Sequence, residues 1–202
     1  MKKKNWKKHL TWIIPVGILL ILLLWVVGSY NGLIGQDENV KKSWANVEST
    51  YQRRADLIPN LVATVQGVVD FEQETQTKIA ELRTGATAIK SEIQNAQTPA
   101  ELDEAGNKLN DIVAGYRSLN INVENYPDLK SSQNFLSLQD DLAGTENRIN
   151  VARQDFNKAV NGYNVKVRRI PTNIIAGLFG FEVKEGFESE EGAENVPLVS
   201  FG

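Results

Sequence analysis

The chain has 202 residues, a net charge of −3 and no cysteine, so its length allows one ordinary domain plus a short extra segment and excludes a disulfide framework. Five of its 22 basic residues are lysines within the first eight positions, and the remaining 17 face 25 acidic residues, a net charge of about −8. That balance argues against nucleic-acid binding.

The first element in chain order is an apolar run of 18 residues from Leu10 to Val27, which contains no charge. A helix of this length covers about 27 Å, close to the ~30 Å hydrocarbon thickness of a bilayer. Trp12 and Trp25 lie near its two ends, where aromatic side chains favour the membrane–water interface. The pattern predicts a transmembrane helix in residues 10–29 that contacts the lipid bilayer through residues 10–27, with both tryptophans as interface anchors.

A cleaved signal peptide and a buried core helix are the alternatives. The apolar region of a signal peptide usually has about 7–15 residues, fewer than this run, although Val27-Gly28-Ser29 loosely resembles a cleavage site. The lysines directly upstream disfavour a core helix. Because short basic flanks stay on the cytoplasmic side, residues 1–9 are expected to form a cytoplasmic head, with everything after about Tyr30 outside.

Residues 30–181 predict an all-α ectodomain of long helices. Apolar residues at the 3–4 spacing of a helix face mark the stretches 40–58, 61–93, 102–123 and 135–170. The third stretch begins with a capping-box signal, Thr98-Pro99-Ala100-Glu101, in which Thr98 serves as the N-cap. Tyr126-Pro127-Asp128 is expected to break the chain again.

The fourth stretch carries a seven-residue repeat of apolar or aromatic residues, which is typical of coiled-coil packing against other helices. These side chains are therefore expected in a core and not in a cofactor pocket. The repeating residues are Phe135, Leu142, Ile149, Phe156, Tyr163 and Ile170.

Pro59 decides how many helices this ectodomain has. Proline removes a backbone donor and disfavours a helical conformation at the preceding residue, and Asn60 follows it. A tight turn at Pro59 predicts an up-and-down antiparallel four-helix bundle. The alternative is three long helices, the first of them kinked at Pro59.

The chain changes character after Pro171. Thr172 can cap a short and very apolar segment, residues 172–181, which the ectodomain is expected to include. Beyond it, residues 182–202 contain six glutamates and one lysine, and such a segment cannot bury enough apolar surface to order itself. We expect it to be an acidic, flexible tail.

These landmarks together resemble the bacterial LemA family over nearly the whole chain. The most specific segments are residues 51–62 (YQRRADLIPNLV), residues 139–148 (QDDLAGTENR) and residues 171–181 (PTNIIAGLFGF). The resemblance implies a helical-bundle ectodomain on an anchor in the bacterial cell (inner) membrane. That family has no established enzymatic activity. A relative in magnetosome-forming bacteria takes part in building those membranes, which suggests a role in organising membrane or envelope components.

The sequence contains few residues suited to catalysis, and we expect no enzyme and no catalytic, cofactor-binding or metal site. The single histidine, His9, lies in the basic head, so nucleophilic triads lack a base on the exported side and zinc lacks its usual ligands. Asp140 and Asp141 are adjacent and point about 100° apart on a helix, so they do not converge on one ion.

Two arginine pairs precede prolines: Arg53-Arg54 before Pro59, and Arg168-Arg169 before Pro171. Arginine near a helix C-terminus interacts favourably with the terminal carbonyls, which is the structural interpretation of both pairs. For the second pair the functional alternative is contact with anionic lipid headgroups.

If the fourth helix returns to the membrane, the apolar segment lies near the bilayer and contacts the membrane or a partner. Capping of the bundle's end is the alternative. The candidate contact residues are Arg168, Arg169, Ile174, Ile175, Leu178, Phe179 and Phe181.

Two functional hypotheses follow from these expectations. The first is a non-enzymatic scaffold or adaptor that holds unidentified envelope proteins. The second is an accessory or regulatory subunit of a membrane enzyme such as a protease. The sequence leaves a homo-oligomer open, because a spare apolar face on one long helix would suffice to form one.

Overall fold

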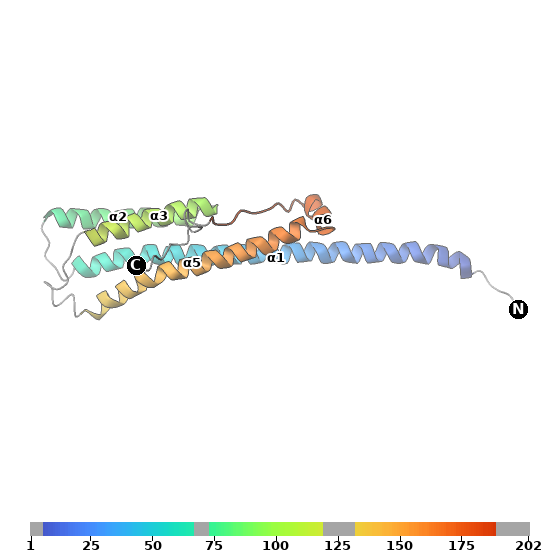
Figure 1. Cartoon of the computed structure of the whole chain (residues 1–202), viewed down its shortest axis with the longest axis horizontal. Helices are drawn as coiled ribbons and strands as arrows, with labels where there is room; N and C mark the ends of the chain where they lie inside the picture. The colour runs from blue at the N-terminus through green and yellow to red at the C-terminus, as the bar shows by residue number, and fades with distance from the viewer. Residues whose placement is uncertain (1–5, 67–72, 119–131, 189–202) are drawn as a thin grey trace, which may run out of the picture. The chain divides into compact units, whose positions relative to one another are not determined.

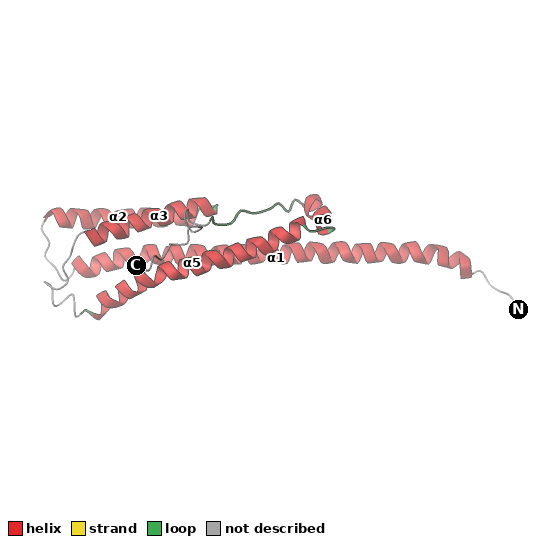
Figure 2. Ribbon diagram, in the orientation of Figure 1, coloured by secondary structure: helices red, strands yellow, loops and turns green. Residues whose placement is uncertain are grey.

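The computed structural model describes residues 6–66, 73–118 and 132–188, and within these ranges all regular structure is helical (Figure 2). The prediction of an all-helical chain is confirmed. The predicted break at Tyr126-Pro127 and the end of the acidic tail lie outside the described residues. The helices are α1 (Trp6–Gln66), α2 (Gln73–Asn95), α3 (Pro99–Ser118), α5 (Gln133–Arg168) and α6 (Thr172–Phe179).

Helix α1 continues through Pro59, so the predicted turn at this proline is wrong. Proline inside a helix costs about 3 kcal/mol. The large apolar residues around it are almost completely buried, among them Ile58, Leu61 and Val62. Because full burial of one large aliphatic side chain contributes about 1.5–3 kcal/mol, packing on both sides of the proline outweighs its cost. The first helix passes through Pro59 as the alternative required, but it ends at Gln66 and α2 begins at Gln73, so the described residues hold more than the three long helices of that alternative.

The N-terminal part of α1 exposes most of its apolar side chains, including Trp12, Leu19 and Leu24. By length and composition this helix is able to cross a membrane. The same helix carries buried apolar residues further along, such as Leu33 and Val47. One continuous element therefore contains both an exposed apolar surface and part of the packed core.

The chain divides into two compact units. Unit 1 contains the residues up to Lys42 and those from Lys158 to Lys184, and unit 2 contains residues 43–157 and the chain from Glu185 onward. Helices α1 and α5 contribute residues to both units, and each unit is described separately below.

In unit 2, α2 and α3 lie side by side as an antiparallel pair (Figure 1). Their approach is close: a Cβ added at Gly85 would lie 3.1 Å from Ile112 Cδ1. The predicted capping box between these helices is confirmed. Thr98 Oγ1 accepts a hydrogen bond from the backbone N–H of Glu101 at 3.2 Å, and Glu101 Oε2 accepts one from the N–H of Thr98 at 3.3 Å.

Helix α5 presents the predicted seven-residue repeat to the cores of the two units. In unit 2, Phe135 forms a cluster with Leu61 and Val65 of α1, against which Leu142 is packed. Ile149, Phe156 and Tyr163 are also buried. The repeat therefore predicts the core correctly until its final member, Ile170, which is exposed.

In unit 1, the last turns of α5 pack against α1. Lys166 Nζ donates a hydrogen bond of 2.8 Å to the backbone carbonyl of Gly32. The Ile170–Pro171 peptide bond is cis, and α6 begins at Thr172 with Pro171 in the N-cap position. No side chain caps this end, so the expected cap by Thr172 is wrong. Gly180 ends α6 in the left-handed region, with φ of 73°, where glycine is favoured.

Residues 181–188 form an extended segment, and two asparagines of α5 hold it. In unit 1, Asn164 Nδ2 donates to the carbonyl of Lys184 (2.8 Å), and Asn164 Oδ1 accepts from the N–H of the same residue (2.9 Å). In unit 2, Asn157 binds Phe187 in the same two-bond manner, at 2.9 and 2.8 Å. We expected a flexible tail from residue 182 onward, and its first seven residues are instead held by these amide side chains.

Candidate functional site

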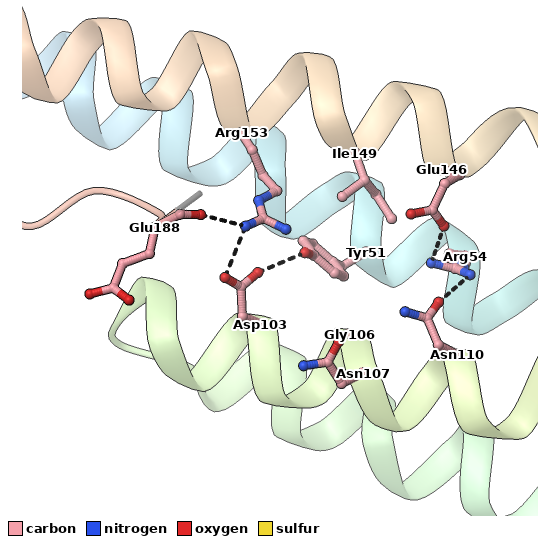
Figure 3. A pocket seen from close by; sticks show the side chains of 10 residues that line it. All are labelled: Tyr51, Arg54, Asp103, Gly106, Asn107, Asn110, Glu146, Ile149, Arg153 and Glu188. Atoms are coloured by element: carbon pink, nitrogen blue, oxygen red, sulfur yellow. Dashed lines mark hydrogen bonds and ion pairs between the residues drawn. The ribbon is translucent and has the colours of Figure 1, made fainter. Parts of the chain in front are cut away.

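A polar pocket of about 290 Å³ lies entirely within unit 2 (Figure 3). Side chains from α1, α3 and α5 face one another across it, and the extended segment closes one end. It is lined by Tyr51, Arg54, Asp103, Gly106, Asn107, Asn110, Glu146, Ile149, Arg153 and Glu188.

Arg54 is the most deeply buried charge at this pocket, with 7% of its surface exposed. Its Nη1 lies 2.8 Å from Glu146 Oε2, and its Nη2 donates to Asn110 Oδ1 at 2.6 Å. Its Nε is buried and has no hydrogen-bond partner. A buried charge is tolerated when it is paired and hydrogen-bonded. Arg54 therefore ties α1 to both α3 and α5.

The expectation that Arg53-Arg54 contacts the terminal carbonyls of a helix is wrong, because α1 does not end near Pro59. Arg53 remains exposed and lies 3.7 Å from Asp141. Of the two arginines, Arg54 is the one that lines the polar pocket. Its partners lie 56 or more residues away in sequence, so no local pattern points to them.

A second group of hydrogen bonds in the pocket meets at Asp103. It accepts hydrogen bonds from the Tyr51 hydroxyl (3.2 Å) and from Arg153 Nη2 (3.0 Å). Arg153 also donates to the backbone carbonyl of Glu188 at 3.3 Å. Its guanidinium lies 4.9 Å from the ring centroid of Phe187, within the range of a cation–π contact. This network joins α1, α3, α5 and the extended segment.

Burial, assisted by the nearby Asp103 charge, raises the pKa of Tyr51 to about 12. Tyr51 is therefore a hydrogen-bond donor at neutral pH and not a general base. The pocket is lined by two arginines and three carboxylates, and no histidine, cysteine or serine is among its lining residues. Within the described part of the chain, no group of three metal-ligating side chains comes together. The arrangement is suited to polar cross-linking of helices.

Next to this network, Trp44, Phe156 and Phe187 form an aromatic cluster. The ring of Phe187 stacks on Trp44 with centroids 6.1 Å apart and packs edge-to-face with Phe156, with centroids 5.4 Å apart. Phe187 was missed in the sequence because the acidic residues around it indicate a solvated tail. The sequence does contain one indication that this segment packs against the helices: apolar residues lie among the acidic ones, namely Phe181, Val183 and Phe187.

The predicted membrane or partner contacts in unit 1 do not form one continuous exposed surface. Ile175 is buried and Phe181 partly so, whereas Ile174, Leu178 and Phe179 are exposed. Contact of this segment with a membrane or a partner, and its alternative of capping the bundle's end, therefore stay predictions.

The two arginines that precede this segment are exposed. Arg168 Nε donates to the backbone carbonyl of Asn164 at 3.4 Å. Of the predicted interface anchors on α1, Trp12 is exposed and Trp25 half-buried.

The polar network and the extended segment lie in the part of the chain that matches a known family. The model of the LemA family matches residues 43–201, more than half of the sequence. The chain belongs to the LemA family. Among its relatives are Magnetosome protein MamQ 2 and MamQ 1 of Paramagnetospirillum magneticum, each 25% identical over 208 aligned residues. The alignments cover 95% of this chain and 76% of each relative.

A third relative is Protein LemA of Metamycoplasma hominis, 25% identical over 83% of this chain and 71% of the relative. The LemA match begins at the first residue of unit 2. The MamQ alignments leave only about ten residues of this chain uncovered, so they include most of the exposed apolar part of α1. Similarity to these relatives is therefore not confined to the packed helices.

Proposed function

We propose that this LemA-family protein is a non-enzymatic, membrane-anchored scaffold or adaptor of the bacterial cell envelope. One observation carries the proposal: α1 presents exposed apolar side chains from Trp12 to Val27 and then continues without a break into buried residues such as Val47 and Tyr51. An apolar surface of that size is unfavourable in water and has the length that a bilayer requires.

We propose a single-pass topology with the N-terminus in the cytoplasm. The lysines that precede the apolar run support this orientation, because basic flanks remain on the cytoplasmic side. Unit 2 and the extended segment are then extracytoplasmic.

We also propose that the four helical stretches of unit 2, residues 43–66, 73–95, 99–118 and 133–157, form an up-and-down bundle. Support comes from the contacts between them. The Lys90–Asp56 ion pair of 2.6 Å joins α2 to α1, and the Lys108–Glu92 pair of 2.8 Å joins α3 to α2. Arg153 and Asp103 join α5 to α3. A bundle held at several levels in this way is a rigid platform that is suited to holding partners.

The non-enzymatic part of the proposal rests on the polar pocket. Arg54 pairs with Glu146, and Arg153 pairs with Asp103, across the helices, and the raised pKa of Tyr51 removes it as a base. Relatives named as magnetosome proteins add support for a structural role, since a scaffold of a cell structure needs no turnover of its own.

Site-specific photo-crosslinking in intact cells, followed by mass spectrometry, tests the scaffold proposal. Crosslinkers placed at the exposed positions Val151 and Leu136 should capture several envelope proteins. Recovery of a single stoichiometric membrane enzyme would replace the scaffold with the alternative, an accessory subunit. Turnover of a hydrolase substrate by the purified chain would overturn the non-enzymatic assignment.

Topology is tested separately with single cysteines, because the chain has none of its own. In intact spheroplasts a membrane-impermeant maleimide should label Asn150→Cys and should label Lys3→Cys only after permeabilisation. The opposite pattern would invert the topology. Release of the chain from membranes by alkaline extraction would contradict anchoring itself.

A further inference from the structure

Helix α6 has no polar face of the kind that a soluble surface helix carries. Its sequence, TNIIAGLF, contains no charge. Ile175 and Ala176 are buried against unit 1, whereas Ile174 is 60% and Leu178 is 74% exposed. Residues four apart on a helix are neighbours on one face, so Ile174 and Leu178 form a continuous apolar face toward solvent. Soluble surface helices place polar residues on that face.

Apolar residues on either side of α6 in the sequence are exposed as well. Ile170 precedes the helix, Phe179 ends it and Val183 follows it, and each of them is more than half exposed. With Ile174 and Leu178, five large apolar side chains within 14 residues of sequence lie in contact with solvent. Exposed apolar residues gathered in this way mark a membrane or protein contact, whereas scattered ones need no explanation.

The position of α6 along α1 distinguishes between these two contacts. The ring of Tyr30 lies 4.8 Å from the ring of Phe179 and 5.8 Å from that of Phe181, measured between centroids. Tyr30 is three residues beyond Val27, the last residue of the apolar run, a distance of about 4.5 Å along a helix. All of these residues belong to unit 1.

That distance matches the headgroup layer of a bilayer. The layer adds about 5–7 Å on each side of the hydrocarbon core, so a helix one turn beyond the end of the span lies within it. Short helices with an apolar face occupy this depth, with the face directed toward the acyl chains. The exposed Arg168 and Arg169 immediately precede this segment, and cations near the surface are attracted to anionic lipids. Glu182, on its other side, is the nearest acidic residue in sequence.

We infer that α6 is a second membrane contact, an interfacial helix whose Ile174–Leu178 face enters the headgroup–acyl boundary of the bilayer that α1 crosses. The inference rests on the proposed anchoring by α1. The lipid surface is favoured over a protein partner because Phe179, at the end of α6, contacts Tyr30, about one helical turn beyond the apolar run of α1. The predicted turn at Pro59 is not required, since the contact of Tyr30 with Phe179 places α6 beside α1 directly.

The test uses the full chain with one introduced cysteine, labelled with an environment-sensitive fluorophore. The chain is reconstituted in vesicles of phosphatidylethanolamine and phosphatidylglycerol that carry nitroxide lipids, either in the headgroup region or deep in the acyl chains. Leu178→Cys reports on α6, Leu22→Cys on the span and Asn150→Cys on unit 2.

The Leu178→Cys probe should lose about half of its emission to shallow nitroxides and less to deep ones, as expected for interfacial depth. Leu22→Cys should be quenched most by deep nitroxides, and Asn150→Cys only by iodide in the water. Adding Ile174→Asp to Leu178→Cys should restore most of the emission, because a carboxylate is excluded from the acyl boundary. Ile174→Ala serves as the matched, uncharged control and should leave the quenching in place.

The outcomes separate this inference from the proposed anchoring. If Leu22→Cys is quenched by deep lipids while Leu178→Cys is quenched only by iodide, α1 is anchored and the inference about α6 is wrong. A Leu178→Cys probe shielded from both lipid nitroxides and iodide would mean that protein covers the face, which also overturns it. If Leu22→Cys is not quenched by lipid nitroxides, the proposed anchoring by α1 is itself wrong. Unchanged circular dichroism of the variants confirms that their fold is intact.

Discussion

Two regions of the chain begin with the same short pattern, an arginine pair followed by a proline, and fold in opposite ways. Around Arg53-Arg54 the helix passes through Pro59, and Arg54 is buried. Around Arg168-Arg169 the helix ends at Arg168, and both arginines are exposed. The local sequence therefore does not determine whether a proline ends a helix.

The difference lies in what surrounds each proline. Ile58, which precedes Pro59, is 2% exposed, and Ile170, which precedes Pro171, is 79% exposed. Where the flanking side chains are buried, their packing offsets the lost hydrogen bond and the steric conflict of the proline ring. Where they are exposed, nothing offsets those costs and the helix ends. Burial sets the outcome, and four predictions test how differently the two regions are stabilised.

The largest effect is expected at Arg54. Arg54→Ala removes the charge-assisted bonds to Glu146 and Asn110 together with the packing of a buried side chain, and should lower the free energy of unfolding by about 2–4 kcal/mol. Arg53→Ala is the matched control. Its side chain is 56% exposed and 3.7 Å from Asp141, so the change should be at most about 0.5 kcal/mol.

Urea unfolding of the full chain in detergent, followed by far-UV circular dichroism, measures both variants. Equal losses for Arg53→Ala and Arg54→Ala would show that burial does not distinguish the two arginines.

The next effect tests how tightly the buried region is packed. A Cβ at Gly106 would lie 2.5 Å from Tyr51 Cε1, so Gly106→Ala must displace the ring that bonds to Asp103. Overpacking of this kind costs about 1–3 kcal/mol. Gly144→Ala on α5 meets nothing within 4 Å, so it should stabilise the chain by about 0.5–1 kcal/mol through helix propensity alone. The same unfolding measurement gives both values, and a stable Gly106→Ala variant would mean that the Tyr51 contact yields easily.

Pro59→Ala tests the balance between proline and packing directly. Alanine restores an N–H that can donate to the carbonyl of Ala55 and removes the ring conflict, while the buried neighbours remain. The variant should gain about 1–2 kcal/mol, less than the full penalty for proline because the unfolded chain gains freedom and some packing is lost. A rise in the melting temperature of the full chain is the expected observation. A fall would mean that packing of the proline ring itself stabilises this region.

Much of the fold is predictable because its signals are local or periodic. The capping box needs only Thr98 and Glu101, three residues apart. The repeat from Phe135 to Tyr163 identifies the buried face of α5 through helix geometry alone. The apolar run of α1 is recognised by length and absence of charge. Each of these features depends on neighbours in sequence and on no distant contact.

The remainder depends on contacts between distant residues. The continuity of α1 at Pro59 depends on burial that only the packed helices supply. The partners of Arg54 lie on α3 and α5, and polar residues on those helices look like a solvated surface in the sequence. Asn157 and Asn164 are seven residues apart, and their pattern does not reveal that both bind the backbone of the extended segment. Polar contacts of this type carry no periodic signal.

The smallest effect is expected in unit 1, where a partly buried ion pair helps to hold the extended segment. Asp37 binds Lys184 and Lys41, each at 2.9 Å. Burial alone would raise the pKa of Asp37, but the hydrogen bonds and charges of Lys184 and Lys41 outweigh it and hold the pKa below its usual value. A carboxylate with a lowered pKa stabilises the folded state above its unfolded pKa, about 3.9, and this stability is lost as the pH falls through the lower, folded-state value.

Asp37→Asn should therefore cost about 0.5–1 kcal/mol at pH 7, and the difference from the unaltered chain should shrink as the pH is lowered below about 4. Glu38→Gln is the control, since Glu38 is mostly exposed and its ion pair with Lys41 joins two residues three apart on α1; its effect should stay below about 0.5 kcal/mol. Urea unfolding at several pH values gives both curves. A loss at pH 7 as large as that of Arg54→Ala, or one independent of pH, would show that unit 1 is held by a buried charge in the way unit 2 is. The two units would then not differ in how their charged residues stabilise them.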